Sequence, residues 1–420
     1  MVLLLGEDIN FKLMNPILIN YNLVYTDNEM LHMTKKNQIT LICSGSEDGM
    51  IKEDRIVNEF CKLVSIDSPT FGERKMADYL KEELLSLGFT VMEDTAGEKY
   101  GSNCGNVYGY LPGRLKGEPL LFSAHMDTVE PSKGKKAIVG DDGTITSDGT
   151  TVLGADDVSG IVGILEALRV IHENKLPHRS IEVLFPIAEE SYLLGSNEYN
   201  FNEIKSKEAY VLDLSGPVGL AALKAPTLVS FTAIIKGKAA HAGFAPQDGI
   251  HAIKIGAKAI TLIDLGRVDD EMTVNVGIME GGVARNIVPD SCIIKGEVRS
   301  LTHEKAVGEA ERIKNIFMGS VKDFGAACDY ETSFGCIAYE VEEAHPVVQR
   351  FQKVCKELDY ETRLVTTCGG SDNNNFMLHG ITGIVIACGM NQVHSCNEYT
   401  TIEELKRISN IVLGLMTREE

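Results

Sequence analysis

The stretch "SIEVLFPIAEES", residues 180–191, decides the fold. Its apolar part, from Ile181 to Ile187, is typical of a buried strand. Two adjacent carboxylates, Glu189 and Glu190, follow at its end. A strand that simply reaches the surface explains such a pair in most proteins, because glutamate is usually exposed. Whether these two side chains are solvated or functional depends on what the other strands carry at the same place.

Strand-like and helix-like segments alternate on both sides of this stretch. The predicted strands are "PLLFSAHMDTV" (119–129), "EAYVLDLSG" (208–216) and "TGIVIACGM" (382–390). The predicted helices are the amphipathic "RKMADYLKEELLSLGF" (74–89), in which Gly88 is the stop signal, and "SGIVGILEALRVIHEN" (159–174). This alternation predicts an α/β fold with a mostly parallel sheet, in which ligands bind at the carboxyl ends of the strands.

The composition narrows the class of protein. The chain has 420 residues, a formal net charge of −20 and a pI near 5.0. This charge repels the phosphates of nucleic acids and anionic membranes, so neither is an expected partner. No apolar run approaches the roughly 20 residues that span a bilayer. The ten cysteines are irregularly spaced, which is typical of reduced thiols in a cytoplasmic protein.

The length predicts more than one domain. Residues 1–49 show no clear helical or strand period and are interpreted as an N-terminal extension, with Met50 as an alternative start. Residues 50–226 and 334–420 are predicted to form one discontinuous α/β domain. In residues 227–333 the pattern of predicted strands and helices changes. Their β-α-β-β-α-β order predicts an inserted ferredoxin-like α+β domain.

Five separate segments place metal-binding residue types at one predicted edge of the sheet. They are His125 with Asp127, Asp156 with Asp157, Glu189 with Glu190, Asp213, and His394. Each has an ordinary structural explanation when taken alone, because an Asp favours the first turn of a helix and a His after a strand is usually a surface group. Together, carboxylates that converge on one crevice repel each other unless cations compensate their charge.

The ligand types and their number predict two divalent metal ions. Imidazole with carboxylate suits zinc, with cobalt or manganese as alternatives. Two ions about 3.5–4 Å apart need a bridging carboxylate and about two further ligands each, so five ligands are enough. Adjacent residues of a strand point to opposite sides, so Glu189 and Glu190 are poorly placed to bind one ion together. The residues alone leave open whether Asp156 or Asp157 is a ligand, and which of the two glutamates is.

Five motifs carry a family resemblance. In chain order they are "SAHMDTV" (123–129), "GADDVSG" (154–160), "AEES" (188–191), "VLDLSG" (211–216) and "VHSCNEY" (393–399). Each motif is weak alone, but the set resembles the co-catalytic zinc exopeptidase family, which includes peptidase T, aminoacylase, a desuccinylase and glutamate carboxypeptidases. The peptidase T-like branch is the most similar, and the resemblance covers the chain from about Met50 to its end. It implies a zinc-exopeptidase catalytic domain with an inserted lid domain.

The resemblance also implies a role for each residue at the sheet edge. Asp156 would bridge two metal ions. The remaining ligands would be His125 and Asp213 for one ion, and Glu190 and His394 for the other. Asp127 would orient His125, as carboxylates commonly do for metal-binding imidazoles. Glu189 would be the general base, which answers why a strand ends in two carboxylates.

The inserted segment and a glycine-rich loop supply candidates for substrate binding. His241 lies in the loop "AAHAG", and the resemblance implies that it donates to the substrate oxyanion when the lid closes. Asn286 and Arg299 are implied to meet the substrate's free carboxylate, for which Arg is well built. Gly370 lies in "CGGSDNNNF", where backbone N–H groups can approach a substrate. Plain surface positions are the alternative for His241 and Arg299. The resemblance also implies that two copies of the chain can form a homodimer through this domain.

These observations predict a dinuclear metal-dependent exopeptidase, an aminopeptidase that releases N-terminal residues from short peptides in the manner of a tripeptidase. The main alternative is a related small-amide hydrolase, such as an N-acyl amino acid deacylase or a carboxypeptidase. A catalytically silent peptide-binding homologue is disfavoured because Glu189 and all five ligands are present. A hydrolase that uses Cys368 or Cys396 as its nucleophile is a further alternative, which thiol alkylation distinguishes from metal chemistry.

Overall fold

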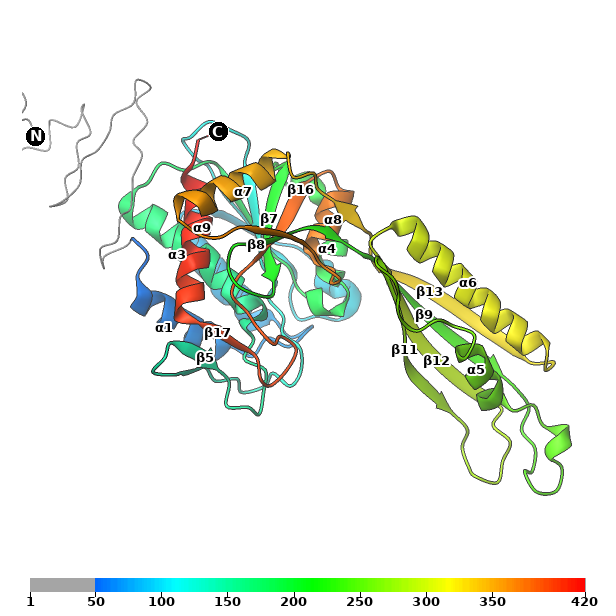
Figure 1. Cartoon of the computed structure of the whole chain (residues 1–420). Coiled ribbons are helices and arrows are strands. Elements are labelled where there is room, and N and C mark those ends of the chain that lie inside the picture. The colour runs from blue at the N-terminus through cyan, green and yellow to red at the C-terminus, as the bar shows by residue number, and fades with distance from the viewer. Residues whose placement is uncertain (1–49, 420) are drawn as a thin grey trace, which may run out of the picture. The chain divides into compact units, whose positions relative to one another are not determined.

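The computed structural model describes residues 50–419, and its centre is a mixed sheet flanked by helices (Figure 1). Within these residues the main sheet has nine strands in the order β1-β2-β6-β3-β7-β16-β8-β14, with β15 paired to β8. The strands are β1 (Thr90–Glu93), β2 (Val107–Leu111), β3 (Leu120–Ser123), β6 (Ile181–Phe185), β7 (Glu208–Leu214), β8 (Leu220–Ala225), β14 (Tyr339–Glu340), β15 (Arg363–Thr366) and β16 (Thr382–Ala387). The predicted extension over residues 1–49, and the alternative start at Met50, concern a part of the chain outside the described residues.

The four central strands of this sheet are parallel. Strand β3 pairs with β6 and β7, and β7 pairs with β16, all in parallel register. On one flank β1 and β2 are antiparallel, and on the other β8 and β14 are antiparallel to their neighbours. The α/β class is therefore confirmed, and the parallel arrangement holds for the central strands that carry the candidate site. Their carboxyl ends lie at one edge of the sheet, as the site prediction requires.

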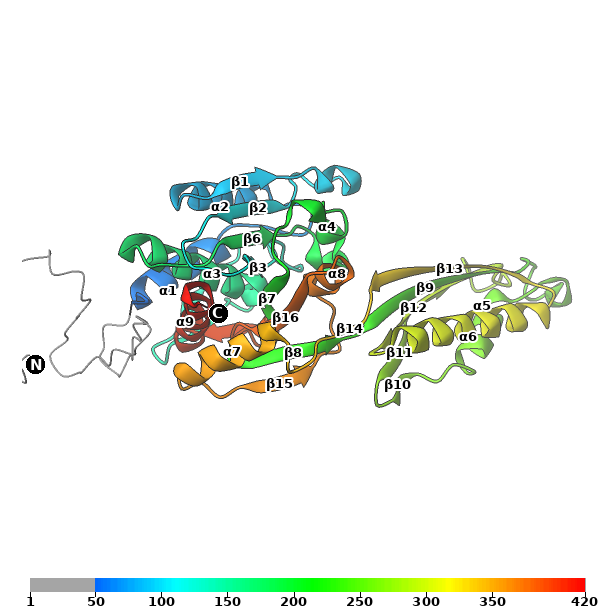
Figure 2. The same cartoon turned by 90° about the horizontal axis from the view of Figure 1, so that it is seen from above.

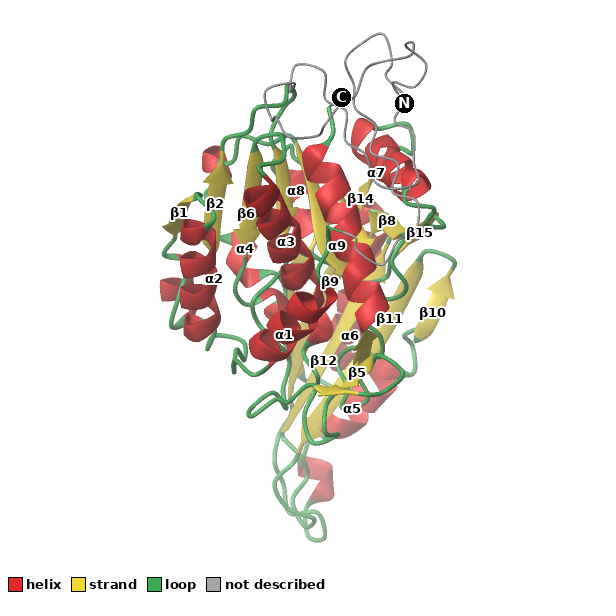
Figure 3. Cartoon of the chain, turned by 90° about the vertical axis from the view of Figure 1, so that its left-hand side faces the viewer, coloured by secondary structure: helices red, strands yellow, loops and turns green. Residues whose placement is uncertain are grey.

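Helices cover both faces of the main sheet. They are α1 (Glu53–Val64), α2 (Arg74–Ser86), α3 (Ala155–Asn174), α4 (Leu194–Asn197), α7 (Pro346–Glu357), α8 (Asp372–Leu378) and α9 (Ile402–Thr417). Figure 3 shows α1, α3 and α9 in front of the sheet, with α4 and α8 behind it. Helix α3 is apolar on nearly all sides and is buried along almost its whole length, which is what a helix packed between a sheet and two other helices needs.

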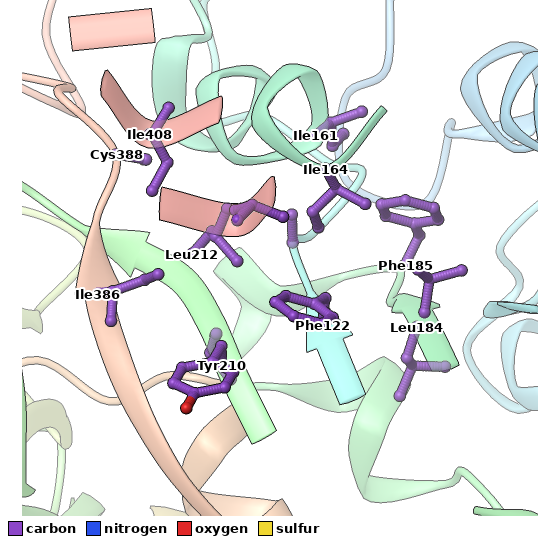
Figure 4. Packing of buried hydrophobic residues seen from close by; sticks show 14 of the residues in the cluster. Phe122, Ile161, Ile164, Leu184, Phe185, Tyr210, Leu212, Ile386, Cys388 and Ile408 are labelled. Atoms are coloured by element: carbon purple, nitrogen blue, oxygen red, sulfur yellow. The ribbon is translucent and has the colours of Figure 1, made fainter. Parts of the chain in front are cut away.

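The main core lies between the sheet and these helices. Figure 4 shows Phe122 and Leu212 from the strands facing Ile164 of α3 and Ile408 of α9. All four side chains are fully buried. Burial of a large apolar side chain contributes about 1.5–3 kcal/mol to stability, so this layer anchors the strands whose ends form the site.

A carboxylate at the end of β1 ties the sheet to α2. Glu93 accepts hydrogen bonds from the Arg74 guanidinium at 2.6 and 2.8 Å, from Lys81 Nζ at 2.5 Å and from the Gly105 backbone N–H at 3.1 Å. The hydrogen bonds from Arg74 first, and then those from Lys81 and Gly105, lower the pKa of Glu93 to about 2, although partial burial opposes the shift. The charged carboxylate is thus more stable in the folded chain than in the unfolded one.

Glu93→Gln is expected to lower the free energy of unfolding at pH 7 by about 1–2 kcal/mol, because these contacts are charge-assisted and only partly exposed. The folded-state pKa lies below the unfolded value of 4.5, so the contribution is complete above pH 4.5 and is lost as the pH falls toward 2. Urea unfolding at pH 7 and pH 3 measures the change. An equal difference between wild type and variant at both pH values would contradict the assignment, and Glu82→Gln, on the exposed side of α2, is the control.

A small sheet connects two distant segments of the chain. It joins β17 (Tyr399–Thr401) to β5 (Thr144–Thr146), and β5 to β4 (Ile138–Val139), all antiparallel. The pairing brings the segment that follows His394 next to the segment that leads into α3.

A second antiparallel sheet stands between β8 and β14 in the chain. Its order is β10-β11-β12-β9-β13, and two helices lie side by side on one of its faces (Figure 2). These elements are β9 (Thr227–Lys236), α5 (Ala252–Ile260), β10 (Gly266–Asp269), β11 (Met272–Gly281), β12 (Ser291–Ser300), α6 (His303–Lys322) and β13 (Ala327–Cys336). Apart from the added strand β10, the succession is β-α-β-β-α-β. Phe231, Ile255, Ile294 and Phe317 form a core of its own.

No helix within residues 50–419 combines the length and the apolar character that a membrane span needs.

Candidate metal centre and active site

The carboxyl ends of the central strands carry the predicted site residues. His125 follows the end of β3 by two residues, Glu189 and Glu190 follow β6, and Asp213 is the last residue but one of strand β7. His394 lies in the segment between β16 and β17. The remaining residue, Asp156, lies in the irregular, non-helical turn at the start of α3. Parallel strands end at the same edge, so residues far apart in the sequence meet there.

Asp156 lies between the two predicted imidazole ligands. Its Oδ1 atom is 3.0 Å from His125 Nε2, and its Oδ2 atom is 3.3 Å from His394 Nε2. His394 Nε2 is also 3.0 Å from Glu190 Oε2. One carboxylate that faces an imidazole with each oxygen has the arrangement of a bridging ligand.

Ligand atoms of two overlapping groups lie within 4.8 Å of one another. One group is His125, Asp156 and Glu190, and the other is His125, Glu189 and Asp213. The structure therefore brings together all five predicted ligands and the predicted general base.

The backbone at the start of α3 separates the roles of Asp156 and Asp157. Asp157 Oδ2 accepts a hydrogen bond from the backbone N–H of His125 at 3.2 Å, and its Oδ1 accepts one from Gly160 N–H at 3.2 Å. Both carboxylate oxygens of Asp157 thus accept hydrogen bonds from backbone N–H groups, whereas those of Asp156 face the imidazoles of His125 and His394. This geometry favours Asp156 as the ligand.

The prediction that the strand continues through Glu189 and Glu190 is wrong. Strand β6 ends at Phe185, and Glu189–Ser191 form a short 3₁₀ helix that follows Ala188, whose φ is +50°. The turn, not strand alternation, separates the two carboxylates. Glu190 reaches His394, and Glu189 belongs to the group around Asp213.

Asp127 holds this turn in place. Its Oδ1 accepts a hydrogen bond from Glu189 N–H at 2.9 Å, and its Oδ2 accepts one from Glu190 N–H at 3.3 Å. Asp127 Oδ1 is also 3.5 Å from His125 Nδ1, so the same carboxylate faces the side of the imidazole that points away from Asp156. This contact is the one that an orienting carboxylate makes with a metal-binding imidazole.

Two residues that no sequence motif indicates support Asp127 and the turn beside it. Thr70 Oγ1 donates to Asp127 Oδ2 at 2.8 Å, and the buried Glu73 accepts from the backbone N–H of Ala188 at 3.1 Å. Both residues precede α2, where the sequence shows only a helix start. The sequence of this segment does not indicate the hydrogen bonds of Thr70 and Glu73, because these depend on how the chain folds back on the sheet.

The electrostatics of the cluster favour a bound cation. Burial first, and then the negative charge of Asp213, raises the pKa of Glu189 well above its ordinary value. Burial and the charge of Asp156 do the same to the pKa of Asp213. Glu190 Oε1 is buried and has no hydrogen-bond partner among the described residues. Buried carboxylates that repel each other need a compensating positive charge, and the unpartnered oxygen of Glu190 needs a ligand. Divalent metal ions coordinated by these imidazoles and carboxylates supply both.

A cavity of about 310 Å³ opens beside these residues. Its lining includes Asp156, Glu189, Glu190, Asp213 and His394, together with the predicted substrate residues Arg299 and Gly370. Tyr192 and Thr367 also line this cavity, although no sequence motif indicates them. The volume is that of a small-molecule site with a few convergent polar groups.

Arg299 is held firmly at this cavity. Its guanidinium donates to both carboxylate oxygens of Glu297, at 2.8 and 3.3 Å, and to the backbone oxygen of Cys368 at 3.0 Å. Arg299 belongs to β12 of the second sheet, and Cys368 precedes the Gly369–Gly370 turn.

His241 and Asn286 do not line this cavity. They lie in neighbouring exposed loops of the second sheet, where Ala242 N–H donates to Asn286 O at 2.9 Å. His241 Nδ1 accepts from the backbone N–H groups of Gly243 and Phe244 at 3.1 Å each, which leaves Nε2 to carry the proton.

Fold and site define the class of protein: a hydrolase of mixed α/β architecture whose imidazoles and carboxylates meet at the carboxyl ends of the central parallel strands. The sequence matches the model of peptidase family M20/M25/M40 over residues 121–418. It is 37% identical to YqjE, an uncharacterized protein of Bacillus subtilis (strain 168), over 87% of this chain and 99% of that protein. The chain therefore belongs to peptidase family M20/M25/M40, and the predicted resemblance is confirmed.

Two solved structures are similar over nearly their whole length. One is the aminopeptidase PepT from Bacillus cereus ATCC 10987, with 38% identity and a TM-score of 0.81, covering 88% of this chain and 99% of that one. The other is a tripeptidase from Staphylococcus aureus subsp. aureus Mu50, with 35% identity, a TM-score of 0.85 and the same coverage. The protein is thus a peptidase of the PepT-like kind.

Proposed function

We propose that the protein is a dinuclear metal-dependent aminopeptidase that releases N-terminal residues from short peptides, as a tripeptidase does. The observation that carries the proposal is the position of Asp156 between His125 and His394, with Glu189 beside them at the cavity. The similarity to an aminopeptidase and a tripeptidase supports the peptide substrate and the recognition of its N-terminus.

In this proposal five residues hold two divalent ions. Asp156 would contribute to both, with His125 and Asp213 holding one ion and Glu190 and His394 holding the other. Zinc suits this donor set, with cobalt or manganese as alternatives. When bound, such ions lower the pKa of a water molecule toward neutrality and polarise the carbonyl of the scissile amide.

Glu189 serves as the general base. It accepts the proton of the attacking water and passes it to the leaving amine, and burial next to Asp213 suits a carboxylate that must hold a proton. Asp127 keeps Glu189 in position through the backbone N–H of the turn, and it orients the imidazole of His125. No covalent intermediate with the enzyme is needed.

The second sheet is proposed to act as a lid. Residues 50–226 and 334–420 then form the catalytic domain, and residues 227–333 form the inserted domain. His241 would donate its Nε2 proton to the oxyanion, and Asn286 would join the substrate site, when the lid closes over the cavity. We also propose that two copies of the chain pair through this domain. The molecular mass in solution, measured by analytical ultracentrifugation, tests this pairing.

We propose that Arg299 binds the C-terminal carboxylate of the peptide. It lies at the cavity that the candidate ligands line, and Glu297 fixes the plane of its guanidinium. Arg binds carboxylates through paired hydrogen bonds. A fixed Arg at one end of a small cavity limits the length of the peptide, which suits di- and tripeptides.

Arg299→Ala is expected to raise KM for a free tripeptide about 10- to 100-fold, because a charge-assisted hydrogen bond contributes about 1.5–3 kcal/mol. KM for the same tripeptide with an amidated C-terminus should change little. Steady-state kinetics with both substrates measures the difference. Arg267→Ala, at an exposed position of β10, is the control. An equal loss for the free and the amidated peptide would contradict the assignment.

The experiment that tests the proposed function is hydrolysis of di-, tri- and N-acylated peptides before chelation, after chelation and after metal add-back. We expect cleavage of tripeptides with a free N-terminus, loss of activity with the chelator, and recovery with zinc, cobalt or manganese. Preferred cleavage of N-acyl amino acids, or release of C-terminal residues, would favour the deacylase or the carboxypeptidase. No hydrolysis by a fully metal-loaded enzyme would favour the silent peptide-binding homologue.

Thiol alkylation separates metal chemistry from a cysteine nucleophile. Cys368 is exposed and Cys396 is partly exposed, so both can be alkylated. We expect activity to survive alkylation, since neither thiol is hydrogen-bonded to an imidazole within residues 50–419. All nine cysteines in this part of the chain are free, which supports the proposal of a cytoplasmic enzyme.

A further inference from the structure

A carboxylate from the C-terminal region binds the backbone of the turn that carries Asp156, at the start of α3. Glu398 is 1% exposed, and its two oxygens accept hydrogen bonds from the backbone N–H groups of Gly154 at 2.7 Å and Asp156 at 2.9 Å. The residue before α3 is Gly154, which has no side chain to cap the helix itself. Asp156 and Asp157 have non-helical backbone angles, so this distant carboxylate satisfies N–H groups of an irregular turn that precedes the regular part of α3.

These hydrogen bonds fix the position of a candidate metal ligand. The hydrogen bond from the Asp156 amide holds the backbone of the residue whose two side-chain oxygens face His125 and His394. The turn before it has little freedom to adjust, because Gly154 has a φ of +78° and a Cβ atom there would lie 3.1 Å from Lys135 Cε and from Thr128 Cγ2.

The same carboxylate also belongs to the loop of His394. His394 has a φ of +59° and a half-exposed side chain, so its position depends on how the loop is held. Glu398 N–H donates to Ser395 O at 3.1 Å, and the next residue, Tyr399, begins the strand that pairs with β5. Glu398 thus joins the loop of one candidate ligand to the helix of another.

We propose that Glu398 is a positioning residue that sets the separation of Asp156 and His394 and so determines the affinity of the site for divalent metal ions. It does not touch the ions. The inference rests on the proposed metal site, and it adds a residue that acts only through the backbone of the ligands. Replacing groups that orient metal ligands typically weakens metal binding about 10- to 100-fold.

The test is calorimetric titration of the metal-free full chain with Zn²⁺ and with Co²⁺. Glu398→Gln keeps the size of the side chain but points an NH₂ group at one of the two backbone N–H groups. We expect its metal affinity to fall about 10- to 100-fold. Glu398→Asp keeps the charge but is too short to reach both N–H groups, so its affinity should also fall.

Glu182→Gln is the matched control. Glu182 is fully buried and also accepts two backbone N–H groups, those of Lys205 at 2.9 Å and Ser206 at 2.7 Å, but it lies outside the site. We expect this variant to lose thermal stability while its metal affinity stays that of the wild type. A second readout is the rise of Tm on adding Zn²⁺, which should shrink in the Glu398 variants and not in the control.

The outcomes are distinct. Wild-type affinity in Glu398→Asp with a loss only in Glu398→Gln would mean that the charge of Glu398 acts alone, and would overturn the inference. Wild-type affinity in both Glu398 variants, or an equal loss in Glu182→Gln, would also overturn it. If Glu398→Gln does not fold, Glu398→Asp decides by itself. A wild type that binds no metal would instead contradict the proposed function.

Discussion

Glu189→Gln is expected to lower kcat for tripeptide hydrolysis by about 10²–10⁴-fold, the usual contribution of a general base. The amide of glutamine has nearly the same shape as the carboxylate but cannot accept the proton of the attacking water. Asp127 still accepts the backbone N–H of residue 189, so the turn should keep its position. Metal content should remain that of the wild type, since the five proposed ligands are intact. Stopped assays together with metal analysis of the same sample measure both quantities.

The neighbouring residue provides the matched control for this experiment. Glu190→Gln changes the same chemical group one position further along, at the carboxylate that lies 3.0 Å from His394 Nε2. We expect this variant to lose metal affinity as well as activity. If Glu189→Gln also lost metal, Glu189 would be a ligand in the group with His125 and Asp213, and its role as the base would be wrong.

Asp156→Asn should abolish both metal binding and hydrolysis at micromolar metal. Asp156 is the residue that faces both imidazoles, and a neutral amide offers one weak oxygen donor where a bridge needs two charged ones. Removing it also leaves the carboxylates of Glu190 and Asp213 without the two ions that compensate their charge. Calorimetric titration with zinc and assays across a range of zinc concentrations measure the loss.

Asp148→Asn is the control for this substitution, because Asp148 is an exposed residue of the same region and its carboxylate accepts a hydrogen bond from Thr150. It should bind metal and hydrolyse peptides like the wild type. Retention of two ions by Asp156→Asn would show that Asp156 does not bridge them. Full activity of Asp156→Asn at saturating zinc would show that Asp156 is not part of the metal centre.

The sequence predicts the residues at the sheet edge well because their positions follow from strand direction. His125, Glu189, Asp213 and His394 each lie at or after the carboxyl end of a buried strand, and parallel strands bring such ends together. The alternation of apolar strands and helices also shows the α/β class. What the pattern does not show is the antiparallel direction of the flanking strands, which depends on how the connections return to the sheet.

Local backbone geometry could not be predicted from the pattern. The left-handed conformation of Ala188 turns Glu189 and Glu190 apart, where the sequence suggests only strand alternation. The choice between Asp156 and Asp157 likewise depends on which carboxylate meets the backbone N–H of His125. Glu398 lies in the motif around His394. Its hydrogen-bond donors, the backbone N–H groups of Asp156 and Gly154, are 242 and 244 residues away in the chain, so no sequence spacing indicates them.

The most direct measurement is an anomalous difference map, recorded at the zinc absorption edge, from crystals of the zinc-loaded enzyme. Our account predicts two peaks about 3.5–4 Å apart with Asp156 between them. His125 and Asp213 should lie at one peak, and Glu190 and His394 at the other. A map with no peak at these residues, or with a single peak that leaves either His125 or His394 without contact in a fully active crystal, would contradict it.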